Sequence, residues 1–217
     1  MQLKKLQKSI DKLQSLYGDP ALCSIYGTGC IRNPKIMFVF MNPTARNVSA
    51  NKKWKGLKAP WLGTKNTWQL FYKVGILPEF YFHKTQELKT KEWSAEFSAK
   101  IYKEIAKKKV YITNLAKCAQ LDARPLKNVV FKEYLEIMQQ EIIFTNPKCI
   151  ITFGNQVSSI ILGKQISVSK YKNKQKEILK INGKDFNVYP VFYPVGQGRR
   201  NMNLATKRIK SIVSPEI

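Results

Sequence analysis

The chain has 217 residues, of which 44% are hydrophobic and 12% aromatic. These fractions exclude wholesale disorder, because the apolar surface is sufficient to offset the entropy of ordering the chain, and the length fits one domain better than two. Lysine and arginine number 38 against 14 acidic residues, which gives a formal charge of +24. We expect a polyanionic partner, although a lysine-rich composition alone also produces such a charge.

No apolar segment approaches the roughly 20 residues that cross a bilayer, and the start of the chain lacks the apolar core of a signal peptide. We therefore expect a soluble intracellular protein that has no membrane contact and is monomeric. We expect a single domain over residues 1–217, in which residues 1–33 form a helix and a lead-in segment.

Apolar residues at helical spacing predict an N-terminal helix from Leu3 to Leu16, which ends at Gly18. The continuous apolar segment Ile36–Phe40 is typical of a strand that is buried on both faces of a parallel sheet. Residues 44–65 are polar, basic and interrupted by glycine and proline, and this composition indicates a long functional loop.

Helices and strands alternate in the rest of the chain. The predicted helices cover residues 68–74, 93–105, 131–142, 157–162 and 202–213, and the predicted strands cover residues 110–113, 149–153, 178–181 and 186–193. Asn182-Gly183 is a strong hairpin signal between the last two strands. This order predicts a three-layer α/β/α fold with a central, mainly parallel four-stranded sheet and a C-terminal hairpin.

Polar and aromatic residues follow several predicted strands, at positions where α/β proteins collect ligand-binding groups. Four such segments occur in this order: Met41-Asn42-Pro43, Ala59-Pro60-Trp61-Leu62-Gly63, Thr113-Asn114-Leu115-Ala116-Lys117-Cys118 and Tyr193-Pro194-Val195-Gly196. Together they resemble the motifs of the uracil-DNA glycosylase superfamily, with features of the single-strand-selective and mismatch-specific branches and of the iron-sulfur branch. The resemblance spans residues 34–212 and implies the fold of that superfamily.

In this resemblance Asn42 orients the water that attacks the sugar carbon, and Met41 lies beside it in the base pocket. A neutral amide suits this role, because it can orient water next to a cationic sugar. Phe40 and Thr44 stand where the family has glycine, so the approach of the backbone to the ligand differs. An ordinary Asn-Pro turn after a strand is the alternative interpretation.

The resemblance makes Trp61 the aromatic residue that stacks on the flipped base, where the family usually has phenylalanine. An indole that caps the core is the alternative. The resemblance makes Asn114 the reader of the base edge, since an amide complements N3-H and O4 of uracil and is mismatched to cytosine. A strand-end asparagine can instead cap the following segment.

Tyr193 replaces the histidine or asparagine of the last motif, and a phenol can donate a hydrogen bond to the negative charge on a departing base. The Gly-Gln-Gly-Arg-Arg segment that follows corresponds to the loop that enters the duplex and holds phosphates. The residues expected to contact DNA are Arg46, Lys117, Gln197, Arg199 and Arg200.

Cys118 matches the third cysteine of the iron-sulfur members, but Cys23 and Cys30 are too far apart for their usual pair, and Cys149 belongs to a predicted strand. Thiolates bind clusters at other spacings, yet buried or free thiols are the favoured interpretation. We expect no iron-sulfur cluster, no other cofactor and no metal. His83, the single histidine, falls in a predicted loop and is expected to be structural or exposed.

The resemblance implies a DNA glycosylase that flips uracil or a related deaminated base out of single- or double-stranded DNA and hydrolyses its N-glycosidic bond, in base-excision repair. A catalytically silent relative that senses or shields damaged or single-stranded DNA is the alternative. Tyr193 favours the silent relative, whereas Asn42 and Asn114 disfavour it. A member directed at RNA or nucleotides is a third possibility, since positive charge does not distinguish polymers.

Overall fold

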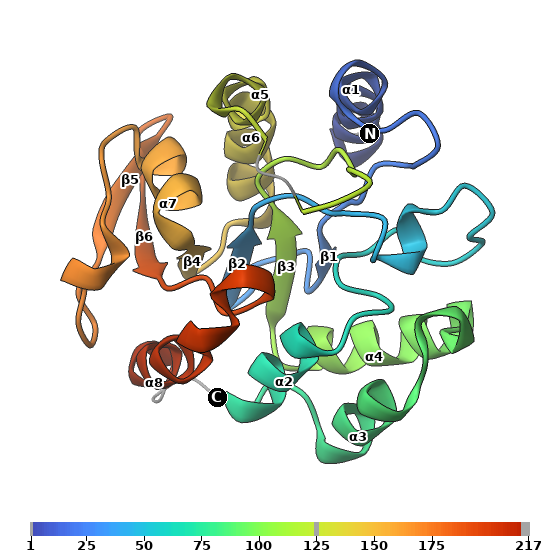
Figure 1. Cartoon of the computed structure of the whole chain (residues 1–217). Coiled ribbons are helices and arrows are strands. Elements are labelled where there is room, and N and C mark those ends of the chain that lie inside the picture. The colour runs from blue at the N-terminus through green and yellow to red at the C-terminus, as the bar shows by residue number, and fades with distance from the viewer. Residues whose placement is uncertain (1, 124–125, 214–217) are drawn as a thin grey trace.

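The computed structural model describes residues 2–123 and 126–213, and over these residues helices cover both faces of a central sheet (Figure 1). The sheet has the strand order β1-β3-β2-β4-β6-β5. Its strands are β1 (Thr28–Gly29), β2 (Ile36–Phe40), β3 (Val110–Asn114), β4 (Cys149–Phe153), β5 (Glu177–Ile181) and β6 (Lys184–Val191). Strands β3, β2, β4 and β6 are parallel, while β1 and β5 run antiparallel at the two edges. The predicted mainly parallel sheet with a C-terminal hairpin is confirmed.

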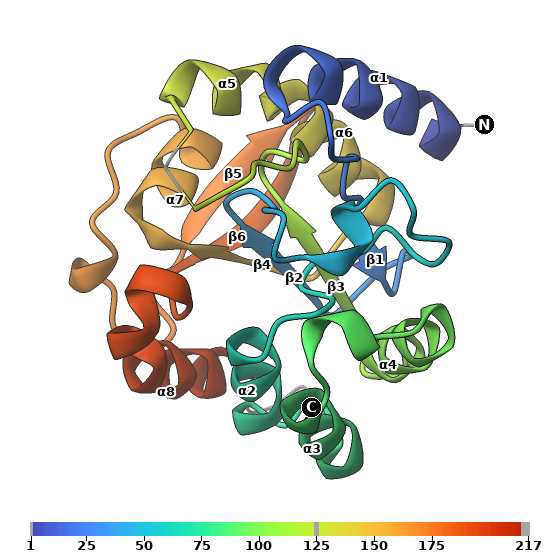
Figure 2. The same cartoon turned by 45° about the vertical axis from the view of Figure 1, so that its right-hand side comes forward.

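Two helical layers enclose the sheet (Figures 1 and 2). One layer consists of α1 (Gln2–Tyr17), α5 (Asn128–Glu133), α6 (Leu135–Thr145) and α7 (Gly154–Leu162). The other consists of α2 (Asn66–Lys73), α3 (Glu79–Glu87), α4 (Ala95–Lys107) and α8 (Met202–Val213). The three-layer α/β/α architecture expected from the sequence is therefore present.

Strand β2 is uniformly apolar because both of its faces are buried. Ile36, Phe38 and Phe40 pack against the layer of α2, α4 and α8, whereas Met37 and Val39 pack against the layer of α1, α6 and α7. Each fully buried large side chain of this kind stabilises the fold by about 1.5–3 kcal/mol. The strand therefore joins two hydrophobic clusters and fixes the position of the residues that follow Phe40.

Local capping agrees with the element boundaries. The Ser94 hydroxyl accepts a hydrogen bond from the amide of Phe97 at 3.1 Å and starts α4, while Lys107 lies in its last turn, where a cation interacts favourably with the helix dipole. Asn182 and Gly183 both adopt positive φ between β5 and β6, as the predicted hairpin requires.

Several elements differ from the prediction. The two-residue strand β1 and helix α3 were not expected, and the predicted helix over residues 131–142 is divided into α5 and α6 at Tyr134. The last strand was expected over residues 186–193, but β6 runs from Lys184 to Val191, so Tyr193 lies in the loop after it. Helix α3 buries little beyond Thr85 and exposes 71% of Phe80, so its sequence carries no clear apolar stripe. His83 lies in α3 and not in a loop, and its exposed ring is 3.4 Å from Glu79.

Among the residues that the structure describes, no helix combines the length and the apolar character needed to span a membrane.

Candidate functional site

The carboxyl ends of the four parallel strands meet at one edge of the sheet, and a cavity of about 720 Å³ opens there. The register places Phe40 opposite Asn114 and Phe153 opposite Val191, so segments distant in sequence reach the same place. The expected pocket residues that line this cavity are Met41, Asn42, Trp61, Asn114 and Tyr193. Such an edge is the usual ligand-binding position of open α/β sheets.

Residues 40–45 and residues 114–120 run side by side beyond the strand ends, and residues 41–45 and Asn114 from these two segments line the cavity. Their backbone hydrogen bonds are Leu115 N to Phe40 O at 2.7 Å, Ala116 N to Met41 O at 3.0 Å, Gln120 N to Pro43 O at 3.1 Å and Ala45 N to Gln120 O at 2.7 Å. We call these two segments the paired wall. The pairing continues parallel-sheet hydrogen bonding into the loops and holds Asn42 beside Asn114.

The Asn42 side chain is half-buried in the paired wall. Its amide nitrogen donates to the carbonyl oxygen of Pro43 at 3.1 Å. An amide oxygen has two acceptor positions, and this bond leaves both of them available. Asn42 can therefore accept a hydrogen bond from a water molecule in the cavity.

Asn114 is only 2% exposed, and its side-chain oxygen has no hydrogen-bond partner within the described chain. A buried acceptor without a partner costs about 1–3 kcal/mol, and such groups in native proteins call for an explanation. Other lining residues show the same feature. The buried atoms without a partner among the described lining residues are Trp61 Nε1, Thr67 Oγ1 and Asn114 Oδ1. The cavity is suited to a polar ligand that supplies hydrogen bonds.

Trp61 adopts φ +67°, which is an outlier for a bulky side chain. Its carbonyl oxygen accepts hydrogen bonds from the Thr64 amide at 3.1 Å, from the Thr64 hydroxyl at 2.7 Å and from the Trp68 indole at 3.1 Å. These contacts maintain a backbone conformation that costs on the order of 1–3 kcal/mol, and strain of this kind clusters at functional sites.

Phe40 is fully buried beneath the cavity, and sequence analysis did not foresee its role. Its ring stacks on Phe153 at 4.3 Å between centroids and meets Trp61 edge-on at 4.8 Å and Tyr193 edge-on at 6.3 Å. The residue that replaces the family's glycine thus forms an aromatic floor under both rings. The alternation of β2 could have indicated it, since Phe40 shares a face with Phe38.

Tyr193 lies two residues beyond β6 and lines the cavity. Burial raises the pKa of its hydroxyl well above the usual value of 10.0, so the phenol remains a neutral donor in the physiological range. The loop behind it approaches closely: a Cβ atom at Gly198 would lie 2.1 Å from the Tyr193 carbonyl oxygen. Glycine is therefore required at position 198.

Basic groups lie in and next to the lining of the cavity. Arg46 is exposed and lines the cavity, and Arg199 and Arg200 are exposed in the 3₁₀ segment Gly196–Asn201, whose first residue also lines it. The N-terminus of α2 adds the positive end of a helix dipole, since its first residues belong to the lining. The side chain of Gln197, which was expected to contact DNA, lies outside the described part of the chain.

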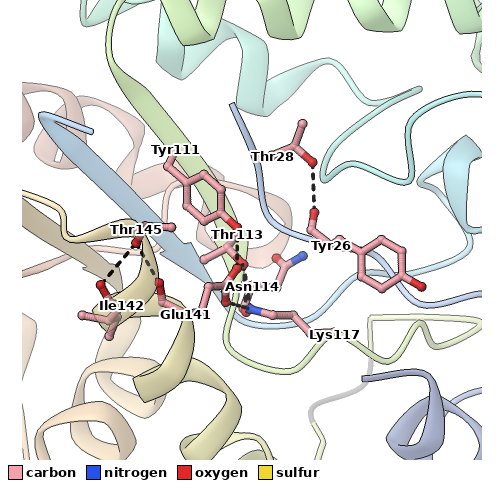
Figure 3. Close-up of polar contacts among 9 residues, drawn as sticks. All are labelled: Tyr26, Thr28, Tyr111, Thr113, Asn114, Lys117, Glu141, Ile142 and Thr145. Carbon is pink, nitrogen blue, oxygen red and sulfur yellow. Dashed lines mark hydrogen bonds and ion pairs between the residues drawn. The ribbon is translucent and has the colours of Figure 1, made fainter. Parts of the chain in front are cut away.

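Lys117 does not belong to this basic rim, and the expectation that it contacts DNA is wrong. Its side chain is completely buried, and its ammonium group lies 2.6 Å from a carboxylate oxygen of Glu141 (Figure 3). Burial lowers the pKa of Lys117, and this effect exceeds the opposite effect of the negative charge on Glu141. A phosphate group outside the protein cannot reach this nitrogen.

Glu141 is the centre of a buried network behind β3, which Figure 3 shows. One carboxylate oxygen accepts hydrogen bonds from the Tyr111 hydroxyl at 2.7 Å and from the Thr113 hydroxyl at 3.0 Å. Lys117 also donates to the Thr113 hydroxyl at 2.6 Å and to the backbone oxygen of Asn114. The network thus contacts the backbone from which the Asn114 side chain projects. Nothing in the sequence alone associated Glu141 with Lys117.

Leu121 was also missed. It lines the cavity directly after the paired wall and is 62% exposed, which is unusual for a large apolar residue at a polar, basic mouth. The bridge between Gln120 and Thr44 fixes the backbone beside it. An isolated leucine in a loop carries no sequence pattern, so only the position relative to the cavity identifies it.

None of the four cysteines forms a disulfide, and Cys118, within the paired wall, is fully buried. Burial raises the pKa of its thiol, whereas an iron-sulfur ligand must be a thiolate. Within the described residues no three His, Cys, Asp or Glu side chains come together as a potential metal site. The absence of a cluster and of a metal stays a prediction.

A family model described as the uracil DNA glycosylase superfamily matches residues 26–213. A search of curated proteins finds no match. The matched region contains all strands of the described sheet and the residues that line the cavity. Because the match covers most of the 217 residues and the architecture agrees with it, the chain belongs to the uracil DNA glycosylase superfamily.

Proposed function

We propose that this protein is a DNA glycosylase that flips uracil or another deaminated base into the cavity and hydrolyses its N-glycosidic bond. Superfamily members are typically DNA glycosylases, so DNA is the expected partner class. The observation that carries the proposal is the position of Asn42 and Asn114 on one wall of a single cavity, with the buried oxygen of Asn114 lacking a partner in the described chain. The first residue serves the chemistry and the second serves recognition.

Base recognition uses the Asn114 amide. Its unpartnered oxygen can accept a hydrogen bond from N3-H of uracil, and its nitrogen can donate to O4. Cytosine has an acceptor at N3 and a donor at N4, so the same amide would face two mismatched groups. A buried site that is left unpaired by the wrong ligand discriminates strongly. Hypoxanthine and xanthine also carry a ring N-H beside a carbonyl group and remain candidate substrates.

The hydrolytic step uses Asn42 and Tyr193. Asn42 orients a water molecule toward the anomeric carbon as the sugar becomes cationic. Tyr193 donates a hydrogen bond to the base as negative charge develops on it, and burial keeps the phenol protonated. Trp61, fixed by the aromatic floor of Phe40, provides a face on which the flipped base stacks.

DNA binding uses the exposed arginines at the mouth and the overall charge of +24. In this proposal Arg46, Arg199 and Arg200 contact phosphates near the flipped nucleotide; Arg46 lines the cavity, and the two others lie in the segment whose first residue lines it. Leu121 would meet the neighbouring bases of a duplex, where apolar side chains can occupy the space that a flipped base leaves. Affinity should fall with salt, and loss of one phosphate contact should reduce the log-log slope by about one.

A cleavage panel tests the proposal. Oligonucleotides carrying uracil, hypoxanthine or xanthine, in single strands and in mispairs, are incubated with the protein and with Asn42→Ala under single-turnover conditions. The parent should release at least one of these bases and the variant none. Release that is undiminished in Asn42→Ala would remove the assigned role of this residue.

A silent DNA-binding relative is the second candidate, and the replacement at position 193 favours it. If this candidate is right, the parent releases no base from any oligonucleotide of the panel yet binds DNA with a steep salt dependence. Tyr193→His then decides whether the rest of the site is competent. Gain of base release in this variant would indicate an intact site that lacks only its donor, whereas continued silence would support a binding role.

A further inference from the structure

The side chains on β3 alternate between two faces, and this alternation separates recognition from support. Tyr111 packs with the layer of α6, while its neighbour Ile112 packs with the layer of α2 and α4. Thr113 follows Tyr111 toward the Glu141 network, and Asn114 lines the cavity. The residue proposed to read the base thus projects from the strand opposite a buried polar network.

Lys117 connects this network to the backbone of the reader. Its ammonium group contacts the Asn114 carbonyl oxygen, the Thr113 hydroxyl and the Glu141 carboxylate, and these groups satisfy its three donors (Figure 3). Lys117 and Glu141 are at most 3% exposed, so solvent screens the contacts weakly. The contacts hold the backbone at the end of β3, next to the bend at Leu115 and Ala116.

The network is also closed against water by the lead-in segment. A Cβ atom at Gly27 would lie 2.1 Å from the Tyr111 hydroxyl and 2.3 Å from a Glu141 oxygen, so only glycine allows this approach. The amide of Ile25 donates to the Lys117 carbonyl oxygen at 3.0 Å and holds the segment in place. Residues 25–27 therefore enclose a network that would otherwise have access to solvent.

From these contacts we propose that the buried Lys117–Glu141 pair is a positioning unit that orients Asn114 toward the base and thereby sets the rate of base release. This inference rests on the proposed reading of the base by Asn114. Lys117 and Glu141 lie behind the strand and act only through the backbone of Asn114. A pair that served stability alone would hold the fold without affecting the orientation of this amide.

The double variant Lys117→Met/Glu141→Gln separates positioning from stability. It removes both charges together, so no unpaired charge remains in the interior, and the introduced glutamine amide oxygen can still accept hydrogen bonds from Tyr111 and Thr113. The matched control is Thr152→Val/Ser158→Ala, which removes a buried hydroxyl pair at 2.8 Å between helix α7 and strand β4, which β2 separates from β3. Thermal unfolding establishes that both variants are folded.

Two measurements test the inference. Single-turnover release of uracil should slow by about 10- to 100-fold in the double variant, with a DNA half-saturation concentration within about twofold of the parent, while the control stays near the parent. The side-chain amide resonances of Asn114 should form one sharp pair in the parent and become broadened or multiple in the double variant only. A folded double variant with the parent's rate and the parent's Asn114 resonances would overturn the positioning role.

The two proposals fail in different ways. If the parent releases no base, the proposed function fails, and the Asn114 resonances alone decide the positioning role. If the parent is active and Asn114→Asp keeps its base preference, Asn114 is not the reader and the positioning unit loses its purpose. If Asn114 reads the base and the double variant matches the parent, only the positioning inference is wrong.

Discussion

Replacing Asn114 by leucine should stabilise the free protein while removing its ability to recognise a base. In the described structure the side-chain oxygen of Asn114 is buried without a partner, and such an orphan acceptor costs about 1–3 kcal/mol. Leucine has a similar size and no polar atoms, so the free energy of unfolding should rise by about 1 kcal/mol, after allowance for imperfect packing. For a chain of this length the melting temperature should increase by roughly 2–4 °C.

Asn47 provides the matched control, because it is also buried but has its hydrogen bonds made. Its amide donates to the Ala59 carbonyl oxygen at 2.8 Å, and its oxygen accepts from the Ser49 amide at 3.1 Å and from the Ser49 hydroxyl at 2.9 Å. Asn47→Leu leaves these groups unpaired and should destabilise by more than about 2 kcal/mol. Urea unfolding of the two variants measures the contrast. Equal destabilisation of both would refute the view that Asn114 holds an unsatisfied acceptor for a ligand.

Four further variants test other parts of the site. Asn42→Ala should abolish base release, measured by single-turnover assays, and leave DNA affinity, measured by binding titrations, nearly unchanged. A large loss of DNA affinity would contradict the view that Asn42 acts only by orienting the attacking water. Tyr193→Phe should slow base release by about 100- to 1,000-fold. The ratio of the parent rate to the variant rate should stay constant from about pH 7 to about pH 10, because burial raises the pKa of Tyr193 and its hydroxyl keeps its proton. Leu121→Ala should reduce base release from duplexes by about 10-fold relative to release from single strands, since an apolar contact of this size contributes on the order of 1.4 kcal/mol. Leu204→Ala, at another exposed leucine, should leave this ratio of duplex to single-strand release unchanged. Gly27→Ala should lower the free energy of unfolding by about 1–3 kcal/mol through overpacking, as denaturant unfolding will measure. An unchanged free energy of unfolding would argue against the close approach of Tyr111 and Glu141 to this glycine.

The strands β2, β3 and β4 and the residues that follow them could be predicted from the sequence, because each of these three strands is a short apolar run followed by polar residues or glycine. Ile36–Phe40 is the clearest example, since both of its faces are buried and the position of Asn42 follows directly. Helix α3 could not be predicted in the same way. It packs through few side chains and exposes Phe80, so tertiary contacts and not an apolar pattern maintain it.

Lys117 shows where sequence reasoning fails for a charged residue. A lysine beside a predicted DNA site in a strongly basic chain is naturally assigned to phosphate, and its partner Glu141 lies 24 positions further along the chain. Burial and pairing depend on how α6 packs on β3, which the local sequence does not encode. Phe40 illustrates the complementary failure, because its identity was noted as a departure from the family while its contact with Trp61 required the three-dimensional arrangement.

The backbone hydrogen bonds of the paired wall have a mechanical consequence. They tie residues 40–45 to residues 114–120 at four points, so Asn42 and Asn114 cannot separate without breaking them. Trp61 and Tyr193 line the same cavity, and their rings contact Phe40 edge-on. The separation of the Asn42 and Asn114 backbones is therefore set by the main chain and does not depend on the side-chain conformations of Trp61 or Tyr193. Under the proposed function, the water held by Asn42 and the base edge held by Asn114 would keep one fixed separation, whichever deaminated base enters the cavity.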